Sequence, residues 1–130
     1  MSNTGTIIAN DKDIGRIQIL AANLERCGVS NTIITKKDGM VLCEKLLKEN
    51  FQFDKILLDV PCSGEGTFRS SPKGMQMWNI NTVKKLSKIQ KNLIKTAYNL
   101  LKENGTIVYS TCTHAPEENE EIVDFAIKEL

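Results

Sequence analysis

The stretch that decides the fold class is Lys55-Ile56-Leu57-Leu58-Asp59-Val60, a short apolar run with an acid near its end. Strands of a parallel sheet are buried on both faces, so they occur in a sequence as continuous apolar runs of this kind. We therefore predict a strand at 55–60 that is covered on both faces. The run leads into Pro61-Cys62-Ser63-Gly64, where a rigid proline precedes a thiol and a glycine. A tight turn with an incidental cysteine is the alternative interpretation.

Strand and helix patterns alternate through the rest of the chain. Short runs of apolar or β-branched residues predict further strands at 6–9, 31–35 and 106–109. Apolar residues at helical spacing predict helices at 13–27, 40–47, 79–102 and 116–130. The steady alternation of strands and helices predicts an α/β fold with a parallel sheet.

Length and composition are those of about one globular domain. The 130 residues carry 17 Lys and Arg against 16 Asp and Glu, and 41% of them are hydrophobic. This balance excludes a disordered chain and a polybasic or acidic tail for binding nucleic acid. No apolar run approaches the roughly 18 residues of a membrane helix, and the N-terminus lacks the features of a signal peptide. We therefore expect an intracellular protein without a membrane partner.

The four cysteines divide into two pairs with different expected roles. None of them forms a C-x-x-C pair and the chain has a single histidine, so we expect no metal site and free thiols. Cys27 and Cys43 fall within helical patterns, where a free cysteine is usually a small buried hydrophobe. Cys62 and Cys112 instead follow predicted strands directly, at the edge of the sheet where chemistry is expected.

Acidic residues also stand where predicted strands end. In open parallel sheets, ligands bind just beyond the carboxyl ends of the strands. Asp11 follows the first strand, Asp38 follows the second, and Asp59 lies near the end of the third. An acid at the end of an apolar strand costs free energy unless it is paired or used. We therefore expect these three acids and the two thiols to converge on one edge of the sheet.

The residues alone leave the roles of these side chains open. Asp11 offers two acceptor oxygens to the hydroxyls of a ribose, but Asp11 or Asp13 also suits the start of a helix. Asp38-Gly39 fits the exocyclic amine of an adenine, or an ordinary Asp-Gly turn. Cys112 would be a nucleophile if its pKa were lowered, and His114, two residues on, raises the alternative of a cysteine hydrolase.

Two longer motifs contain Cys62 and Cys112. They are Asp59-Val-Pro-Cys-Ser-Gly-Glu-Gly-Thr-Phe-Arg69 and Tyr109-Ser-Thr-Cys-Thr-His-Ala-Pro-Glu-Glu-Asn-Glu120. Together they resemble the two signature motifs of the Sun-type (nucleolar antigen/Sun) RNA cytosine-5 methyltransferases, and Gly5 to Asp11, with Arg16, resembles the family's second cofactor motif. The first motif, with Trp78 beyond it, is most similar to the eukaryotic tRNA-modifying branch. The resemblance implies a Rossmann-like methyltransferase fold and S-adenosylmethionine as the cofactor.

The resemblance also implies a covalent mechanism. Cytosine C5 is too weak a nucleophile to attack a methyl sulfonium, and a thiolate that adds to C6 makes C5 carbanion-like. By similarity the attacking thiol is that of Cys112. Asp59 would hydrogen-bond the N3 edge of the base, and Cys62 would assist the later release of the adduct.

The cofactor contacts are implied in the same way. S-adenosylmethionine would be held by Asp11 at the ribose, by Asp38 at the adenine and by Asp59 near the methionine end. Arg16 matches a basic position of the family motif, although a cation on the surface of a helix is the alternative. No metal is implied.

The implied partner is RNA, with tRNA favoured over rRNA, and no protein partner is predicted. The target base must leave its stack, which is cheapest in single-stranded or loop positions. Arg69 and Lys73 are phosphate candidates near the predicted active-site loop, and Trp78 is expected in the core. A further set of lysines recurs at helical spacing, either as an RNA contact or as a solvated face: Lys84, Lys88, Lys91 and Lys95. The resemblance places a eukaryotic member in the nucleus or nucleolus and any other in the cytoplasm.

The sequence also departs from the family pattern. The glycine-rich loop that follows the family's first strand has no counterpart here, and that strand would lie centrally, between the strands predicted at 6–9 and 55–60. The strands expected beyond residue 130 are absent as well. We therefore predict that residues 1–130 are a partial catalytic domain. A catalytically inactive RNA-binding remnant of such an enzyme is the alternative.

Overall fold

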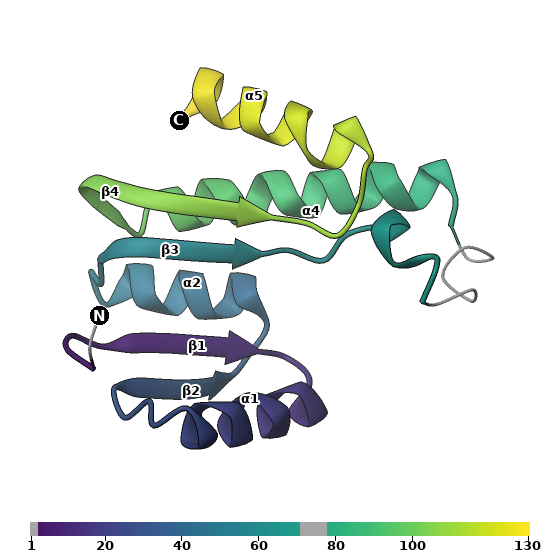
Figure 1. Ribbon diagram of the computed structural model, residues 1–130. Coiled ribbons are helices and arrows are strands. Elements are labelled where there is room, and N and C mark those ends of the chain that lie inside the picture. The colour runs from purple at the N-terminus through teal and green to yellow at the C-terminus, as the bar shows by residue number, and fades with distance from the viewer. Residues whose placement is uncertain (1–2, 71–77) are drawn as a thin grey trace. The chain divides into compact units, whose positions relative to one another are not determined.

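The computed structural model describes residues 3–70 and 78–130 (Figure 1). The contacts within the chain divide it into two compact units, residues 1–45 and 46–130, and each unit is described by itself. The boundary falls within helix α2 (Gly39–Lys48). Within the described ranges, no helix has the length and apolar character that crossing a membrane requires.

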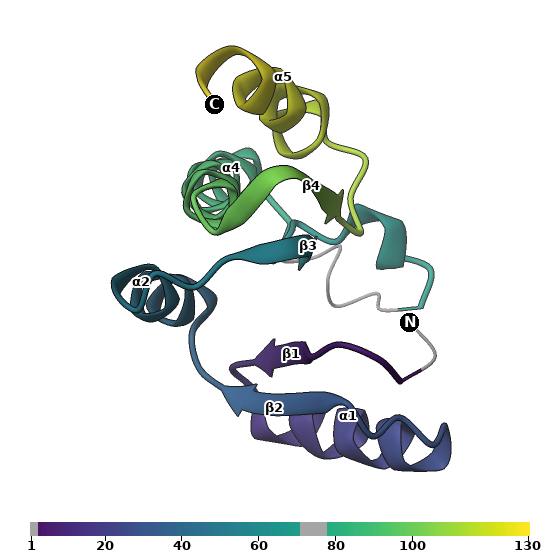
Figure 2. The ribbon, with the colours of Figure 1, turned by 90° about the vertical axis from the view of Figure 1, so that its left-hand side faces the viewer.

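The first unit is a parallel strand pair with its crossover helix. Strands β1 (Ile7–Asp11) and β2 (Thr32–Lys36) pair in parallel, with Ile7 opposite Thr32 and Asp11 opposite Lys36. Helix α1 (Ile14–Arg26) connects them and contacts both strands (Figure 2). Because the two strands run in the same direction, their carboxyl ends, and the loops that follow them, lie side by side.

The second unit repeats this arrangement with two helices on its sheet. Strands β3 (Phe53–Asp59) and β4 (Leu101–Ser110) pair in parallel, and helix α4 (Ile80–Tyr98) connects them. Helix α5 (Glu120–Glu129) follows β4 and packs on α4. Two short 3₁₀ helices, η1 (Glu65–Thr67) and η2 (Pro116–Glu118), lie in the loops beyond the strands. The buried apolar side chains all belong to this unit: Val60, Val83, Ile94, Ala97, Leu100, Ala115 and Ile122.

The predicted α/β class with parallel strand pairs is confirmed, but the strands form two separate two-stranded sheets, β1–β2 and β3–β4. The prediction that strand 55–60 is covered on both faces is wrong in this structure. Leu57 of β3 is 69% exposed, and its register partner Val108 is 54% exposed. Only the other face of β3, with Ile56 and Leu58, lies half-buried. The family resemblance places a further strand between β1 and β3, and no such strand pairs with either among the described residues.

The helix predicted at 79–102 ends earlier, at Tyr98. Leu100 is only 2% exposed, and Leu101 already pairs with Phe53 as the first residue of β4. Asn104 and Gly105 follow the predicted helix and are residue types that commonly end one. They lie inside the strand, at the irregularity where the register shifts, with Asn104 in the left-handed conformation at φ 61°.

The helix predicted at 116–130 is divided at Asn119. The backbone of Asn119 is not helical, with ψ −87°, and η2 and α5 lie on either side of it. Its side-chain amide donates to the carbonyls of Thr113 and Ala115 at 3.2 and 3.0 Å, and its Oδ1 accepts from the Thr111 hydroxyl at 2.7 Å. The Asn119 side chain thus supplies hydrogen-bond partners to the loop after β4, and the helix is interrupted at this residue.

Two predictions of burial are also wrong. Cys27 is exposed at the C-terminal cap of α1, because Gly28 turns the chain away directly after it. Trp78 is 39% exposed and does not belong to the core. Cys43 in α2 is half-buried, and burial raises the pKa of its thiol.

Candidate functional site

The loops that follow β3 and β4 bring Cys62 and Cys112 together, as predicted for two thiols at the ends of neighbouring parallel strands. The Cys112 backbone N–H donates to Cys62 Sγ at 3.1 Å. At the ends of the strands, the Ser110 hydroxyl donates to Leu58 O at 3.3 Å and to Asp59 Oδ1 at 3.4 Å. Asp59, Cys62 and Cys112 therefore share one edge of the β3–β4 sheet.

Further contacts tie the two cysteine loops to each other. The Gly66 N–H donates to Cys112 O at 2.9 Å, and the His114 N–H donates to Glu65 Oε2 at 3.1 Å. The hydroxyls of Ser63 and Thr113 lie 2.8 Å apart. A Cβ at Gly66 would lie 3.0 Å from Cys112 O, so any larger residue at this position would press on the Cys112 backbone.

The chemistry of the sulfur pair follows from its hydrogen bonding. The pKa of Cys112 is raised to about 11, first by the hydrogen bond with the Cys62 side chain, then by burial, the charge on Cys62 and the negative charge of Asp59. With this pKa only about one Cys112 in 10⁴ is a thiolate at pH 7. A neutral thiol is a poor nucleophile, so a reaction at Cys112 requires a group that takes up its proton.

The exposure of the site allows a large substrate to reach it. Cys112 and Asp59 are exposed, and Cys62 is half-buried beside them. Among the described residues no hydrogen bond joins the Cys112 and His114 side chains, and the His114 N–H is held by Glu65. The contacts of this site therefore give no support to the Cys112–His114 hydrolase alternative. Among the described residues, no group of three or more His, Cys, Asp or Glu side chains is placed to hold a metal ion.

The predicted cofactor residues of the first unit lie at the ends of β1 and β2. Asp11 Oδ1 accepts the Asp13 N–H at 2.9 Å, and Asp11 Oδ2 pairs with Arg16 Nε at 3.1 Å. Asp13, not Asp11, caps α1, because its side chain accepts the Arg16 N–H at 2.9 Å. Each carboxylate oxygen of Asp11 keeps a further acceptor position, which is what the hydroxyls of a ribose require.

Asn10 is a positioning residue of this edge that the sequence analysis missed. Its Oδ1 accepts from the Thr35 hydroxyl at 2.9 Å and from the Lys37 N–H at 3.1 Å, and its Nδ2 donates to Lys37 O at 3.0 Å. The loop after β2 is thereby fixed to the end of β1. Asp38 follows in that loop and accepts the Met40 N–H at 3.0 Å through Oδ1, in the turn that begins α2. The ribose and adenine candidates thus come from adjacent loops of one unit.

The second unit also contains two buried polar residues that the sequence analysis missed. Glu118 of η2 and Gln90 of α4 are both 0% exposed, and they contact each other and the Cys62 loop. Glu118 stands in an acid-rich stretch that is typical of a surface. Gln90 could have been found from the sequence, because it is a polar residue on the face of α4 that buries Val83 and Ile94.

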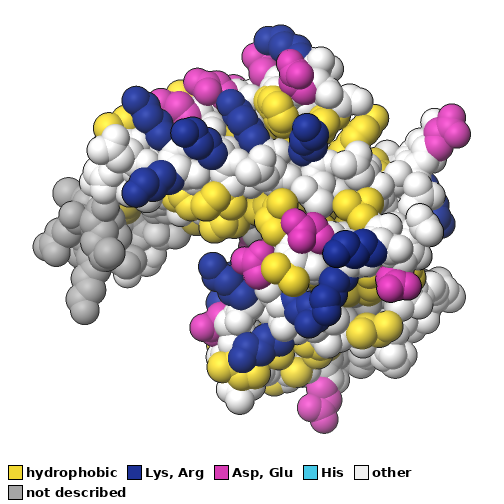
Figure 3. Space-filling view, turned by 180° about the vertical axis from the view of Figure 1, so that it is seen from behind, with side chains coloured by type: hydrophobic (Ala, Val, Ile, Leu, Met, Phe, Trp, Pro, Cys, Tyr) yellow, Lys and Arg dark blue, Asp and Glu magenta, His cyan; other side chains and the backbone are white. Residues whose placement is uncertain are grey.

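The candidate RNA contacts lie on exposed surface where the structure describes them. Arg69 is exposed after η1, and Lys73 lies outside the described residues. Lys84, Lys88 and Lys95 are exposed on α4. Lys91 instead lies 5.8 Å from the centre of the Phe125 ring. On the face shown in Figure 3, acidic side chains stand among the Lys and Arg side chains, so this face is mixed in charge.

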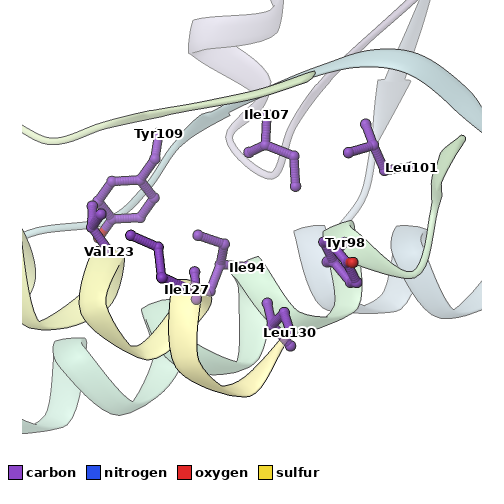
Figure 4. A pocket seen from close by; sticks show the side chains of 9 residues that line it. Ile94, Tyr98, Leu101, Ile107, Tyr109, Val123, Ile127 and Leu130 are labelled. Atoms are coloured by element: carbon purple, nitrogen blue, oxygen red, sulfur yellow. The ribbon is translucent and has the colours of Figure 1, made fainter. Parts of the chain in front are cut away.

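An apolar cavity of about 330 Å³ lies away from the cysteines, between α4, β4 and α5 (Figure 4). Aliphatic and aromatic side chains line it, among them Ile94, Ile107 and Ile127. It contains none of the candidate site residues.

The comparison with protein families decides the assignment. Residues 1–130 match the family described as 16S rRNA methyltransferase RsmB/F. The chain belongs to this family. Ribosomal RNA small subunit methyltransferase F of Vibrio cholerae serotype O1 (strain M66-2) is 43% identical over 122 residues, which is 94% of this chain and 25% of the relative. The protein of that name from Aliivibrio salmonicida (strain LFI1238) is 44% identical over 130 residues, or 100% of this chain and 27% of the relative.

Solved structures agree with the family. NSun6 from Pyrococcus horikoshii with SFG matches with a TM-score of 0.83 and 35% identity, over 98% of this chain and 31% of that chain. A methyltransferase homolog protein from the same organism matches with a TM-score of 0.83 and 35% identity, over 100% of this chain and 39% of that chain. The predicted Rossmann-like methyltransferase fold is confirmed, and the chain holds a fragment of it.

The relatives also bear on the finer predictions. The chain spans about a quarter of the length of the curated relatives it matches. Both relatives are named for ribosomal RNA and come from bacteria, so the eukaryotic tRNA-modifying branch is not confirmed. The roles of the individual site residues, and the single domain 1–130, stay predictions.

Proposed function

We propose that this chain is part of the catalytic domain of an S-adenosylmethionine-dependent RNA (cytosine-5-)-methyltransferase that acts on small-subunit ribosomal RNA. The observation that carries the proposal is the contact between Cys62 and Cys112 beside Asp59, in a member of an RNA methyltransferase family. Methylation at a nitrogen or oxygen needs no covalent catalyst, whereas methylation at cytosine C5 does, because that carbon is not nucleophilic. A pair of exposed thiols at the sheet edge fits the second reaction.

Cys112 is the proposed nucleophile. Its thiolate adds to cytosine C6, and the electron pair displaced toward C5 makes that carbon reactive. The Asp59 carboxyl group hydrogen-bonds the N3 edge of the base and stabilises the adduct. S-adenosylmethionine, when bound, supplies an electrophilic methyl group. Because the Cys112 pKa is about 11 and the residue is exposed, its thiol proton passes to the solvent as the base is engaged.

Cys62 is the proposed partner in the release of the adduct. Its sulfur accepts the Cys112 N–H at 3.1 Å, so it lies next to the residue whose bond to the base forms and later breaks. After methyl transfer the C5 proton must be removed before Cys112 can be eliminated. The Cys62 sulfur, which lies beside Cys112, is placed to assist that step.

The donor set of the first unit fits the cofactor. Asp11 would accept the ribose hydroxyls, with Arg16 holding its carboxylate at 3.1 Å, and Asp38 would accept from the adenine amine. Asp59 of the second unit would lie near the methionine end. The match to a structure solved with SFG, an analogue of S-adenosylmethionine, supports this use of the cofactor.

Ribosomal RNA is proposed as the substrate in place of the tRNA that the motif wording favoured, because the relatives are named for it. Their bacterial origin favours the cytoplasm and gives no support to a nucleolar location. The alternative of an inactive remnant is less well supported, because both cysteine motifs are present and the Cys62 sulfur accepts the Cys112 N–H.

The test is a methylation assay with the protein isolated at its natural length. Purified small ribosomal subunits, their naked RNA and bulk tRNA are incubated with S-adenosylmethionine labelled in the methyl group, and 5-methylcytosine is mapped by bisulfite sequencing. We expect label in small-subunit RNA, its loss in Cys112→Ala, and unchanged labelling in Cys27→Ala, which removes an exposed thiol of the other unit. Labelling of another atom or base, or full activity of Cys112→Ala, would refute the proposal.

A further inference from the structure

A fully buried carboxylate lies behind the cysteine loops. Glu118 is 0% exposed, and its two oxygens accept the Ser63 N–H at 3.2 and 3.1 Å. Oε2 also accepts from Gln90 Nε2 at 2.7 Å. A buried carboxylate costs free energy even when it is paired, and an apolar side chain would often serve stability as well. The position of this acid therefore calls for an explanation other than stability.

Gln90 links the same loop to α4. Its Nε2 donates to Pro61 O at 2.8 Å as well as to Glu118. Both neighbours are acceptors, so the NH₂ group must face them, and Oε1 is then left without a hydrogen-bond partner among the described residues. The Gln90 amide thus provides a donor to the carbonyl of Pro61 in the Cys62 loop, while its own Oε1 has no partner among the described residues.

The backbone of Glu118 is fixed from the opposite side. The Tyr109 hydroxyl donates to Glu118 O at 2.7 Å. Burial raises the pKa of Tyr109, and the negative charge of Glu118 raises it further, so this hydroxyl keeps its proton. Since Tyr109 belongs to β4, the backbone of Glu118 is anchored to the strand that leads to Cys112.

We propose that Glu118 is a positioning residue that, together with Gln90, holds the loop 61–63 so that the Cys62 sulfur meets Cys112. The inference rests on the proposed function, because it assigns the two thiols to one reaction. Glu118 itself does not reach the thiols: it acts through the Ser63 amide, one residue from Cys62. Removing that anchor leaves the Ser63 amide without its acceptor, and the proposal predicts that the Cys62 sulfur then moves away from Cys112.

The experiment measures the alkylation of Cys112 by iodoacetamide across pH, without RNA or cofactor, and quantifies it by peptide mass spectrometry. In Glu118→Ala, loss of the Cys62 contact should lower the Cys112 pKa from about 11 toward the ordinary 9.0. At pH 8 a fall of that size raises the thiolate fraction about 100-fold, and the weaker nucleophilicity of the less basic thiolate leaves a rate increase of about tenfold. Cys62→Ala should give the same change.

The remaining variants separate positioning from general damage. Glu118→Gln keeps an acceptor oxygen for the Ser63 N–H and should shift the profile less than Glu118→Ala. Glu120→Ala removes an exposed acid two residues away and should leave the profile unchanged. In methylation assays Glu118→Ala should lower kcat and leave the KM for RNA unaltered, because the anchor lies behind the thiols.

Two results would overturn the inference. In the first, Cys62→Ala shifts the pH profile of Cys112 alkylation, but Glu118→Ala and Glu118→Gln give the same profile as the control Glu120→Ala. The second concerns the unmodified protein and applies even if Glu118→Ala does not fold. The anchor predicts slow hydrogen exchange at the Ser63 amide, and fast exchange there would contradict the inference; Glu118→Gln then takes the place of Glu118→Ala in the alkylation experiment. Because alkylation needs neither RNA nor cofactor, a failure of methylation alone would refute the proposed function and leave this inference standing.

Discussion

The close approach of Gly66 to the Cys112 backbone gives a prediction whose size follows from the structure. A Cβ added at Gly66 would lie 3.0 Å from Cys112 O and 3.6 Å from its carbonyl carbon. Ordinary contact begins at 3.4 Å, so in Gly66→Ala the Cys112 backbone must move by about 0.4 Å. Overpacking of this kind costs about 1–3 kcal/mol. A misplacement of 1 Å in an active site can cost roughly 10²-fold in rate, so we expect about a tenfold loss in kcat.

The matched control is Gly28→Ala in the other unit. Gly28 has φ +65°, and a Cβ there would meet nothing within 4 Å. This variant should cost about 1 kcal/mol of stability through backbone strain alone, with kcat unchanged. Both variants are compared by chemical denaturation and by single-turnover methylation. A Gly66→Ala protein that is destabilised as expected but methylates RNA at the original rate would refute the claim that this contact positions Cys112.

Three further predictions concern single side chains. Cys62→Ala should lower the pKa of Cys112 from about 11 toward 9.0, which is measured as the pH at which alkylation of Cys112 reaches its plateau. An unchanged pH profile would show that Cys62 does not cause the raised pKa. Asn10→Ala should weaken S-adenosylmethionine binding in calorimetry while RNA affinity stays the same, because two hydrogen bonds to Lys37, next to Asp38, and one to Thr35 are lost. Equal affinity for the cofactor would exclude that role. Lys102 lowers the pKa of Asp54 below its ordinary value of 3.8. The ion pair therefore stabilises the fold at pH values above 3.8, and this stabilisation is lost as the pH falls through the lowered pKa. Lys102→Ala should therefore lower Tm slightly at pH 7 and leave it unchanged at pH 2.

The order of strands and helices could be predicted because it rests on local patterns. The run that ends at Asp59 has the apolar continuity of a parallel strand, and α1 begins after Asp13 as its spacing indicates. The meeting of Cys62 and Cys112 was also predictable, since each follows one of two parallel strands. For two neighbouring parallel strands, the residues just beyond their carboxyl ends lie side by side whatever the rest of the chain does.

The remaining features depend on contacts between distant residues. α4 ends at Tyr98 because Leu101 pairs with Phe53, and no helical pattern contains that pairing. The exposure of Leu57 depends on which neighbours cover the sheet, not on the apolar run itself. Glu118 has the composition of a surface residue and is buried only because the Ser63 amide lies 55 residues away in the sequence and next to it in the fold.

The proposal depends most on one bond, the covalent bond between Cys112 and the target base. RNA that carries 5-fluorocytosine at its cytosines cannot lose the C5 substituent, so an enzyme that adds a thiolate to C6 stays attached after methyl transfer. The protein at its natural length is incubated with this RNA and S-adenosylmethionine, digested, and the nucleotide-bearing peptide is sequenced by tandem mass spectrometry. The account predicts a nucleotide on Cys112. Attachment at Cys62, or no adduct while methylation of ordinary RNA proceeds, would contradict it.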